Sequence, residues 1–480
     1  MDDARLRALD TSTLWHPFTQ MSDYARETPP PPIITGAEGN WLVAHDGRRY
    51  LAANAGYWCL ALGCRPEAVE RAIKAQLDKF AHSTLLGLSH VPALELAARL
   101  TALAGPPLNH VFYADSGSEA VEAALKIAYQ YQVQRGQPER SEFLALGEAY
   151  HGDTLGAVAV GGVDLFHATY KPLLFPVRRV NPPHCYRCAW KLKPESCALE
   201  CAAAMEHAVA EHHRTLAAVV IEPFVLGPGG VIPQPANYLE RVVRAAQEHD
   251  VLVIFDEVAV GMGRLGTLFA FEQLKPGPAD SQGKSRSMGI LPMLTGGTPV
   301  LRRGDKPDLV CLAKGLTAGL LPLSAVLVTE HVYEAFLGSV AERKTFFHGH
   351  TFTGSALGCA AALAALEQLT APGFLEKLRA ETIPAFWRAL EGLRAHPHAG
   401  NLRGRGMMAG VELVRDKQTG EDYPWEQRYG QRVVLAARQR GVNLRAIGDL
   451  VLAVPPLTIT AAEIELLGRV LAESLDEATR

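Results

Sequence analysis

The sequence has little net charge and no long apolar stretch. It contains 47 lysine and arginine residues against 51 aspartate and glutamate residues, a formal net charge of −4 over 480 residues. This near balance lacks the basic excess that attracts nucleic acids or anionic membranes. No uninterrupted apolar run reaches membrane-spanning length, and the first residues lack the basic-then-apolar order of a secretory signal. We therefore expect a cytoplasmic protein that binds neither nucleic acid nor membrane.

Cysteine is scarce for a disulfide-stabilised protein, with eight residues in the whole chain. Four cysteines stand apart in apolar surroundings and are expected in the core: Cys59, Cys64, Cys311 and Cys359. The other four form the array C-x2-C-x8-C-x3-C: Cys185, Cys188, Cys197 and Cys201. Thiolates at this spacing suit a structural Zn²⁺ or an iron–sulfur cluster, and four reduced thiols are the alternative. A metal here would stabilise a surface loop at residues 181–201.

The chain does contain a regular alternation of predicted strands and helices. Short apolar runs bounded by polar or glycine-rich residues predict buried strands at residues 217–221, 251–255 and 309–312. The clearest helix is predicted at residues 116–134, with a stop at Gly136. This alternation is typical of an α/β domain with a mostly parallel sheet. Ligands of such sheets lie beyond the carboxyl ends of the strands, so the polar residues at these ends are the first site candidates.

The length allows two or three domains. We expect a large domain at residues 76–344 and a smaller α+β domain built from both termini, residues 1–75 and 345–480. Within the large domain, residues 275–306 are polar, rich in Gly, Pro and Ser, and without a period, which indicates a mobile surface insertion. Their short apolar part, residues 288–294, could instead dock a partner.

Two polar residues follow predicted strands directly. Asp256 follows residues 251–255, where burial of a carboxylate is costly unless a cation faces it. It could make a structural ion pair or cap a helix. It could instead hold a protonated heterocycle, a pair that gains about 4 kcal/mol at about 4 Å and an effective dielectric of about 20. Lys314 lies just beyond residues 309–312 and is either a solvated loop lysine or a nucleophile whose pKa is lowered by a neighbouring cation.

Two further motifs supply an anion site and an aromatic surface. Gly117 and Ser118 begin the predicted helix, where N–H groups and the helix dipole attract an anion, although a plain N-cap explains the serines equally well. Tyr150 follows a predicted strand at residues 143–146 and could face a flat ligand or pack in a turn. An anion cradle, an aromatic wall, a carboxylate and a lysine together fit pyridoxal 5′-phosphate (PLP).

Over nearly its whole length the sequence resembles the class III aminotransferases of PLP fold type I. The matching segments are Ser116-Gly117-Ser118-Glu119-Ala120, Tyr150-His151-Gly152, Ile221-Glu222-Pro223, Asp256-Glu257-Val258 with Gly263-Arg264, and Ala313-Lys314-Gly315. The resemblance implies the following roles: Gly117 and Ser118 bind the phosphate, Tyr150 stacks on the ring, Asp256 meets the pyridine nitrogen, and Lys314 is the catalytic Schiff-base lysine. It also implies a homodimer, in which His350 and Thr351 contribute a phosphate contact to the neighbouring subunit's site.

A narrower resemblance is to the branch of this family that acts in biotin biosynthesis. The segment Leu14-Trp15-His16-Pro17-Phe18-Thr19-Gln20-Met21 is similar to the signature of this branch, and residues 81–87 and Arg445 fit it too. The branch converts 8-amino-7-oxononanoate to 7,8-diaminononanoate, with S-adenosylmethionine or lysine as amino donor, and the donor stays open. The implied substrate-binding residues are Phe18, Tyr57, Trp58, Tyr150, Gly349 and Arg445. Arg445 would pair with the substrate carboxylate through its planar guanidinium.

Two departures from the branch concern its substrate pocket. Phe18 stands where some members carry Tyr, and Tyr57-Trp58 replaces a Trp-Trp pair. Both departures bear on the choice of amino donor. The alternative function is another class III ω-aminotransferase, which acts on 4-aminobutyrate, ornithine or a diamine, but the segment from Trp15 to Met21 argues against it. A PLP-binding or metal-sensing protein without turnover is disfavoured, because such a protein does not need Lys314, Asp256 and Arg445 together.

Overall fold

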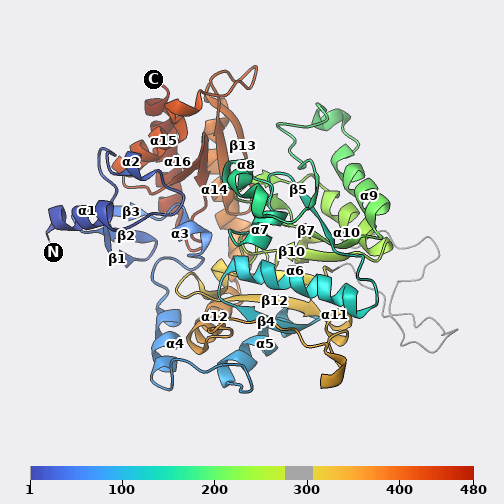
Figure 1. The fold of residues 1–480 in the computed structure, drawn as a ribbon. Helices are drawn as coiled ribbons and strands as arrows, with labels where there is room; N and C mark the ends of the chain where they lie inside the picture. The colour runs from blue at the N-terminus through green and yellow to red at the C-terminus, as the bar shows by residue number, and fades with distance from the viewer. Residues whose placement is uncertain (1, 276–305) are drawn as a thin grey trace. The chain divides into compact units, whose positions relative to one another are not determined.

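The computed structural model of the protein describes residues 2–275 and 306–480. The insertion expected at residues 275–306 therefore lies outside the described residues, apart from its two ends. The chain divides into two compact units (Figure 1). The smaller unit comprises Met1–Glu67, Lys377–Leu402 and Met407–Arg480, and the larger unit comprises Ala68–Glu376 and Arg403–Gly406. Among the described residues, no helix combines the length and the apolar character needed to cross a membrane.

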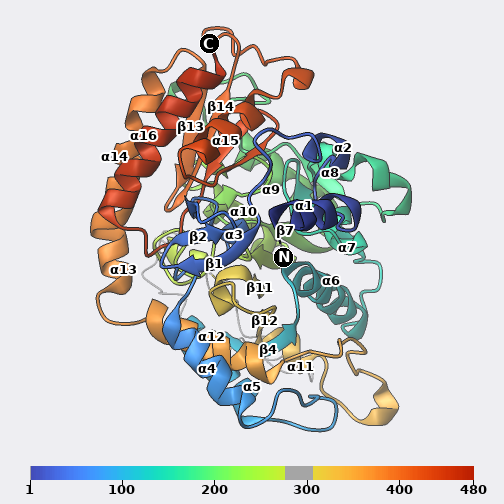
Figure 2. The same ribbon diagram turned by 90° about the vertical axis from the view of Figure 1, so that its left-hand side faces the viewer.

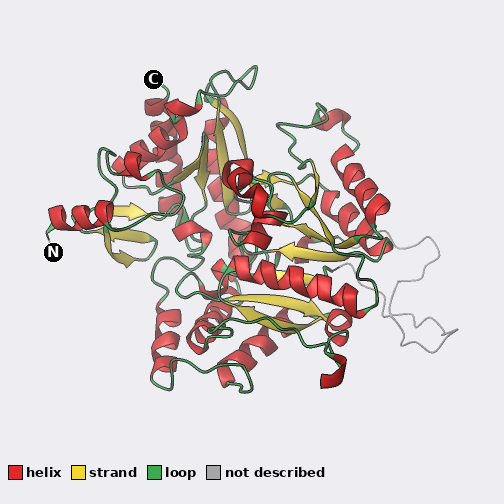
Figure 3. Ribbon diagram, viewed as in Figure 1, coloured by secondary structure: helices red, strands yellow, loops and turns green. Residues whose placement is uncertain are grey.

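The larger unit is built on a seven-stranded sheet. Its strands, in sheet order, are β4 (Leu108–Ala114), β12 (Ser324–Thr329), β11 (Leu309–Leu312), β10 (Leu252–Asp256), β7 (Leu216–Ile221), β5 (Glu142–Leu146) and β6 (Arg178–Val180). Neighbouring strands from β11 to β6 run parallel, and β12 runs antiparallel to both of its neighbours. Strands and helices alternate through this unit (Figure 3), which confirms the predicted α/β class with a mostly parallel sheet.

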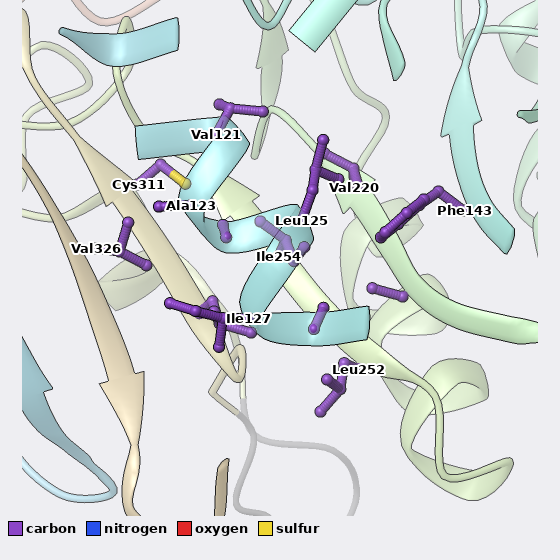
Figure 4. Close-up of a cluster of buried hydrophobic side chains, with 14 of the residues drawn as sticks. Val121, Ala123, Leu125, Ile127, Phe143, Val220, Leu252, Ile254, Cys311 and Val326 are labelled. Atoms are coloured by element: carbon purple, nitrogen blue, oxygen red, sulfur yellow. The ribbon is translucent and has the colours of Figure 1, made fainter. Parts of the chain in front are cut away.

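The apolar runs of the sequence become the central strands, because these strands are covered on both faces. Every residue of β7, β10, β11 and β12 is buried. Helix α6 (Gly117–Gln134) lies across one face, and its side chains pack on those of the strands (Figure 4). Val121, Leu125 and Ile127 of α6 belong to the same buried cluster as Ile254 and Cys311. The predicted strands and helix are thus confirmed.

The larger unit reaches further along the chain than the expected domain does. Residues 345–376, expected in the smaller domain, belong to the larger unit. The reason is helix α12 (Ala356–Leu369), which packs against helix α5 (Val91–Ala104) and against the turn Lys314–Thr317. This contact joins the segment to the strand end that carries Lys314.

The smaller unit combines residues from both ends of the chain. The N-terminal part forms an antiparallel sheet of β1 (Ile34–Glu38), β2 (Trp41–Ala44) and β3 (Arg49–Leu51). The C-terminal part forms a four-stranded sheet in the order β13 (Ala399–Arg405), β14 (Met408–Leu413), β16 (Leu450–Ala453) and β15 (Arg445–Ile447). Helix α16 (Ala461–Ala478) packs against α14 (Ile383–Leu390) and α15 (Tyr429–Gln439), and Figure 2 shows α14 and α16 side by side.

Hydrogen bonds join the two ends of the chain within the smaller unit. The Leu51 N–H donates to Gly441 O at 2.8 Å, and the Asn443 N–H donates to Leu51 O at 2.9 Å. Glu463 accepts hydrogen bonds from Asn40 Nδ2 at 2.8 Å and Trp41 Nε1 at 2.7 Å. The smaller unit therefore has the α+β character and the mixed origin that the sequence predicts.

Candidate active site

Four polar residues lie beyond the carboxyl ends of four neighbouring strands of the larger unit. They are Lys314 after β11, Asp256 at the end of β10, Glu222 after β7, and His151 in the segment after β5. The parallel register places Phe255 beside Ile221, so Asp256 and Glu222 come next at the same edge of the sheet. Parallel strands gather the residues that follow them into one crevice, where ligands of such sheets bind.

Asp256 and His151 form a buried pair. His151 Nδ1 and Asp256 Oδ2 lie 2.8 Å apart, the His151 side chain is fully buried, and Asp256 is 3% exposed. Asp256 Oδ1 also accepts the Val258 N–H at 3.0 Å. Burial disfavours the protonated imidazole, but the hydrogen bond and charge of Asp256, together with the charge of Glu222, raise the pKa of His151. Because a carboxylate only accepts hydrogen bonds, the Nδ1–H of His151 is the donor, and this bond fixes the orientation of the carboxylate and offsets part of the cost of burying it.

The start of α6 is the candidate phosphate-binding site, which we call the cradle. Ser116 is the N-cap, and Glu119 closes a capping box, with its carboxylate accepting the Ser116 N–H at 2.9 Å. The first N–H groups of a helix have no partner within it, so Gly117 and Ser118 present donors and the positive end of the helix dipole to an anion. A Cβ on Gly117 would lie 2.7 Å from Val258 Cγ1, so glycine permits the close approach of the β10 end to this cradle.

Tyr150 and Gly152 lie against this cradle. A Cβ on Gly152, whose φ is +125°, would overlap Ser118 Oγ, and that oxygen accepts the Asp153 N–H at 3.2 Å. Tyr150 donates its hydroxyl to Asp153 at 2.6 Å and its ring is parallel to that of His167, with centroids 6.0 Å apart. The segment after β5 thus fixes an aromatic ring close to an anion-binding helix terminus.

A second cluster of candidate residues lies within the smaller unit. The Arg445 guanidinium, on β15, lies 4.1 Å from the centroid of the Tyr57 ring and 5.5 Å from that of Phe18. These cation–π contacts restrict a long side chain whose planar fork suits a carboxylate. Trp58 is 5% exposed and donates Nε1–H to Asn54 Oδ1 at 3.1 Å.

The backbone beneath this second cluster is strained. Ala55, Gly56, Tyr57 and Trp58 all have positive φ, with values of 40°, 54°, 74° and 74°. A left-handed conformation costs roughly 1–2 kcal/mol for each residue other than glycine. Strain of this kind collects at binding sites, where the surrounding structure holds it in place. The strained turn places the Tyr57 ring against Arg445.

The segment that carries His350 and Thr351 is partly exposed. The His350 N–H donates to Thr353 Oγ1 at 2.8 Å, and Gly349 and Thr351 are exposed. His350 Nε2 is buried and lacks a hydrogen-bond partner among the described residues. The contribution of His350 and Thr351 to a neighbouring subunit stays a prediction.

The four-cysteine array is the predicted metal site. The described residues contain no group of three or more His, Cys, Asp or Glu side chains placed to hold a metal ion, so the structure does not support the predicted Zn²⁺ or iron–sulfur site. Cys197 Sγ instead hydrogen-bonds Glu200 Oε2 at 3.2 Å and accepts the Leu199 N–H at 3.3 Å. Cys201 is buried in α9 (Glu200–His212), whereas Cys185 is exposed. None of the eight cysteines forms a disulfide. Of the four expected in the core, Cys311 and Cys359 are buried, but Cys59 and Cys64 are only half-buried.

One edge of the sheet carries a lysine and a buried carboxylate, and the start of α6 beside them can bind an anion. This combination suits an aminotransferase, and the chain belongs to the class III aminotransferase family. The family model, Aminotransferase class-III, matches residues 23–300 and 299–475. Members of this family use PLP, and the residues present suit that cofactor. The buried carboxylate of Asp256 could accept a hydrogen bond from a protonated ring nitrogen, Lys314 could offer its amine to an aldehyde, and the first N–H groups of α6 could bind a phosphate.

Several of the similar proteins share one name. The chain is 47% identical over 466 residues, 97% of its length and 80% of the relative's, to the adenosylmethionine-8-amino-7-oxononanoate aminotransferase of Nitratidesulfovibrio vulgaris. It is 45% identical to the protein of that name from Geobacter sulfurreducens, with 100% of this chain and 99% of the relative covered. The crystal structure of the protein of that name from Methanocaldococcus jannaschii has a TM-score of 0.89 at 40% identity and full coverage of both chains. An (S)-enantioselective omega-transaminase from Thermomicrobium roseum has a TM-score of 0.88 at 32% identity, with coverage of 100% and 99%.

Two residues of the site have no role assigned from the sequence. His151 and Glu222 occur in matched segments, but only the structure places His151 on Asp256 and Glu222 in contact with the backbone of Tyr150. Glu222 carries a recognisable signal, because it follows the apolar run 217–221 as Asp256 follows 251–255. No such signal predicts the contact of His151 with Asp256, because this contact depends on which strands become neighbours in the sheet.

Replacement of Gly152 by alanine tests the cradle. We expect Gly152→Ala to weaken PLP binding, because the added methyl group displaces Ser118, and to destabilise the protein by more than the roughly 1 kcal/mol typical of a left-handed alanine. Gly136→Ala is the matched control, since Gly136 also has a positive φ (+77°) but an added Cβ there meets no atom within 4 Å. Equal PLP dissociation constants for the two variants would contradict the prediction that the cradle binds the phosphate of PLP.

Proposed function

We propose that the protein transfers an amino group to 8-amino-7-oxononanoate and so forms 7,8-diaminononanoate, with PLP as its cofactor. The observation that carries the proposal is the aromatic setting of Arg445, which suits a substrate with a terminal carboxylate on an apolar chain. Its support from similar proteins is their shared name and their high coverage of this chain. In this account Phe18, Tyr57, Trp58, Tyr150 and Gly349 are the other substrate-binding residues.

The roles of the larger unit's residues follow from their chemistry. Bound PLP supplies an aldehyde that takes up an amine and a ring that draws electrons from the substrate carbon. Gly117 and Ser118 hold the phosphate, Tyr150 stacks on the ring, and Asp256 keeps the ring nitrogen protonated. Lys314 anchors the cofactor, and its Nζ moves the proton at the substrate carbon that bears the amine.

A homodimer is part of the proposal. Large apolar side chains are strongly exposed in two segments of the larger unit, with Leu86 89% exposed and Phe347 81% exposed. The rings of His82 and Phe352, with centroids 5.0 Å apart, show that the two segments approach each other, and exposed apolar surface gathered in this way is typical of an interface. A second copy would cover it and would bring His350 and Thr351 to the partner's phosphate. The cytoplasmic location stays a prediction.

The second candidate function is that of a general ω-aminotransferase acting on 4-aminobutyrate, ornithine or a diamine. The observation that favours it is the similarity to the omega-transaminase structure from Thermomicrobium roseum. Phe18 in place of tyrosine also removes a hydroxyl from the proposed pocket. An assay must therefore decide between the two functions, and it must also identify the amino donor, S-adenosylmethionine or lysine.

The direct test of the activity offers both donors to the purified protein. With PLP and 8-amino-7-oxononanoate, we expect 7,8-diaminononanoate from S-adenosylmethionine or from lysine, measured by mass spectrometry, and none from Lys314→Ala. Absence of product with both donors, from wild-type protein that shows the absorbance of lysine-bound PLP, would favour the general ω-aminotransferase.

Replacement of Arg445 tests recognition of the carboxylate. We expect Arg445→Gln to raise the KM for 8-amino-7-oxononanoate by about 10- to 100-fold, the loss of a charge-assisted hydrogen-bonded pair, and to change kcat less. Arg49→Gln is the control, because Arg49 also lies over an aromatic ring, 5.4 Å from the Trp41 centroid, but pairs with the exposed Glu38. A KM that rises equally in both variants would remove Arg445 from the substrate site.

A further inference from the structure

Glu222 is a buried carboxylate that joins two loops of the larger unit. It is 1% exposed and follows the last residue of β7. Its Oε1 accepts the Tyr150 N–H at 3.0 Å, and its Oε2 accepts the Gly227 N–H at 2.8 Å. Its own carbonyl oxygen accepts Gln234 Nε2 at 2.8 Å. One side chain therefore fixes the backbone of Tyr150 relative to the loop that follows β7.

The backbone around the two loops that Glu222 joins is closely packed. A Cβ on Gly229 would overlap Glu148 O, and a Cβ on Gly162 would lie 2.6 Å from Leu146 O and 2.8 Å from Glu148 N. Glycines at these positions let the neighbouring backbones come into direct contact with the segment after β5. A small change in the anchor of this segment is therefore passed on to Tyr150 and His151, which follow it.

Glu222 also faces the charged pair of the site. The titratable groups that act on it are His151, from the segment after β5, and Asp256, at the end of β10. Burial raises the pKa of Glu222 to about 7, and the positive charge of His151 and the two backbone N–H groups oppose that rise. The ionised form of Glu222, which predominates above this pKa, in turn favours the protonated form of His151.

We propose that Glu222 is a positioning residue for the cofactor, which it serves through Tyr150 and His151. Its hydrogen bond to the Tyr150 N–H sets the place of the stacking ring. Its charge favours the protonated form of His151 and so strengthens the hydrogen bond through which the His151 Nδ1–H orients Asp256 toward the ring nitrogen. The inference rests on the proposed roles of Tyr150 and Asp256, and it adds a residue that touches neither cofactor nor substrate.

The chain offers a matched control in Glu257. Glu257 is also 1% exposed, and it also accepts two backbone N–H groups, from Ala270 at 2.6 Å and Phe271 at 2.7 Å. Burial raises the pKa of Glu257 to about 8, and neither of its N–H donors belongs to Tyr150 or His151. Glu257→Gln therefore removes a buried carboxylate that also lies near the charge of Asp256 but makes no hydrogen bond to the backbone of Tyr150.

The experiment compares Glu222→Gln with Glu257→Gln in PLP-loaded, full-length protein. Glutamine has one carbonyl oxygen, so it can accept only one of the two N–H groups, and it carries no charge. We expect both variants to lower the melting temperature. Only Glu222→Gln should raise the PLP dissociation constant, by about tenfold, and lower the pH midpoint of the absorbance of lysine-bound PLP, by about half a unit.

A third variant separates charge from geometry. Glu222→Asp keeps the negative charge but cannot reach both N–H groups, so we expect a wild-type pH midpoint with weakened PLP binding. If Glu222→Gln lowers the melting temperature but leaves the dissociation constant and the midpoint at wild-type values, as expected for Glu257→Gln, Glu222 is structural only and the inference is overturned. Wild-type protein that fails to form lysine-bound PLP would instead refute the proposed function.

Discussion

The buried hydrogen bond between Asp256 and His151 is the interaction on which the rest of the site depends. A carboxylate removed from water loses several kcal/mol of solvation unless a partner and further hydrogen bonds compensate. Here His151 and the Val258 N–H provide that compensation. Removal of His151 would leave a buried charge at the carboxyl edge of the sheet that the Val258 N–H compensates only in part, so the pair stabilises this edge and fixes the place of its chemistry.

The close approaches of glycine residues keep this edge compact. Gly117 admits Val258 to the start of α6, and Gly152 admits Ser118 to the segment that carries Tyr150. The carboxylate, the aromatic ring and the first N–H groups of α6 are therefore held by close contacts of two glycines with neighbouring side chains. Preorganised groups of this kind do not have to be ordered again when a ligand binds.

The sequence predicts those features whose cause is local. Asp256 and Lys314 stand out because each comes at or just after the end of an apolar run, and the start of α6 stands out because capping residues precede a helical pattern. The contact of Arg445 with Tyr57 joins residues almost 400 positions apart, and the contact of His151 with Asp256 requires the order of strands in the sheet. No local pattern contains that information.

The cysteine array shows the same limit of prediction from local patterns, because here a local pattern is present but does not determine the structure. The spacing C-x2-C-x8-C-x3-C brings four thiols close along the chain but does not fix where each side chain points. In the structure Cys201 is buried in the first turn of a helix, and Cys197 hydrogen-bonds to its neighbours. Residues 345–376 likewise belong to the larger unit because α12, which lies within this segment, packs on α5.

The central claim is that the carboxyl edge of the sheet binds PLP through Lys314. The most direct test is to load the protein with PLP, reduce the linkage with borohydride, and map the modified peptide by mass spectrometry. The account predicts one modified lysine per chain, Lys314, and loss of the modification in Lys314→Ala. Stable labelling of another lysine instead, such as Lys306, or no labelling at all, would contradict it.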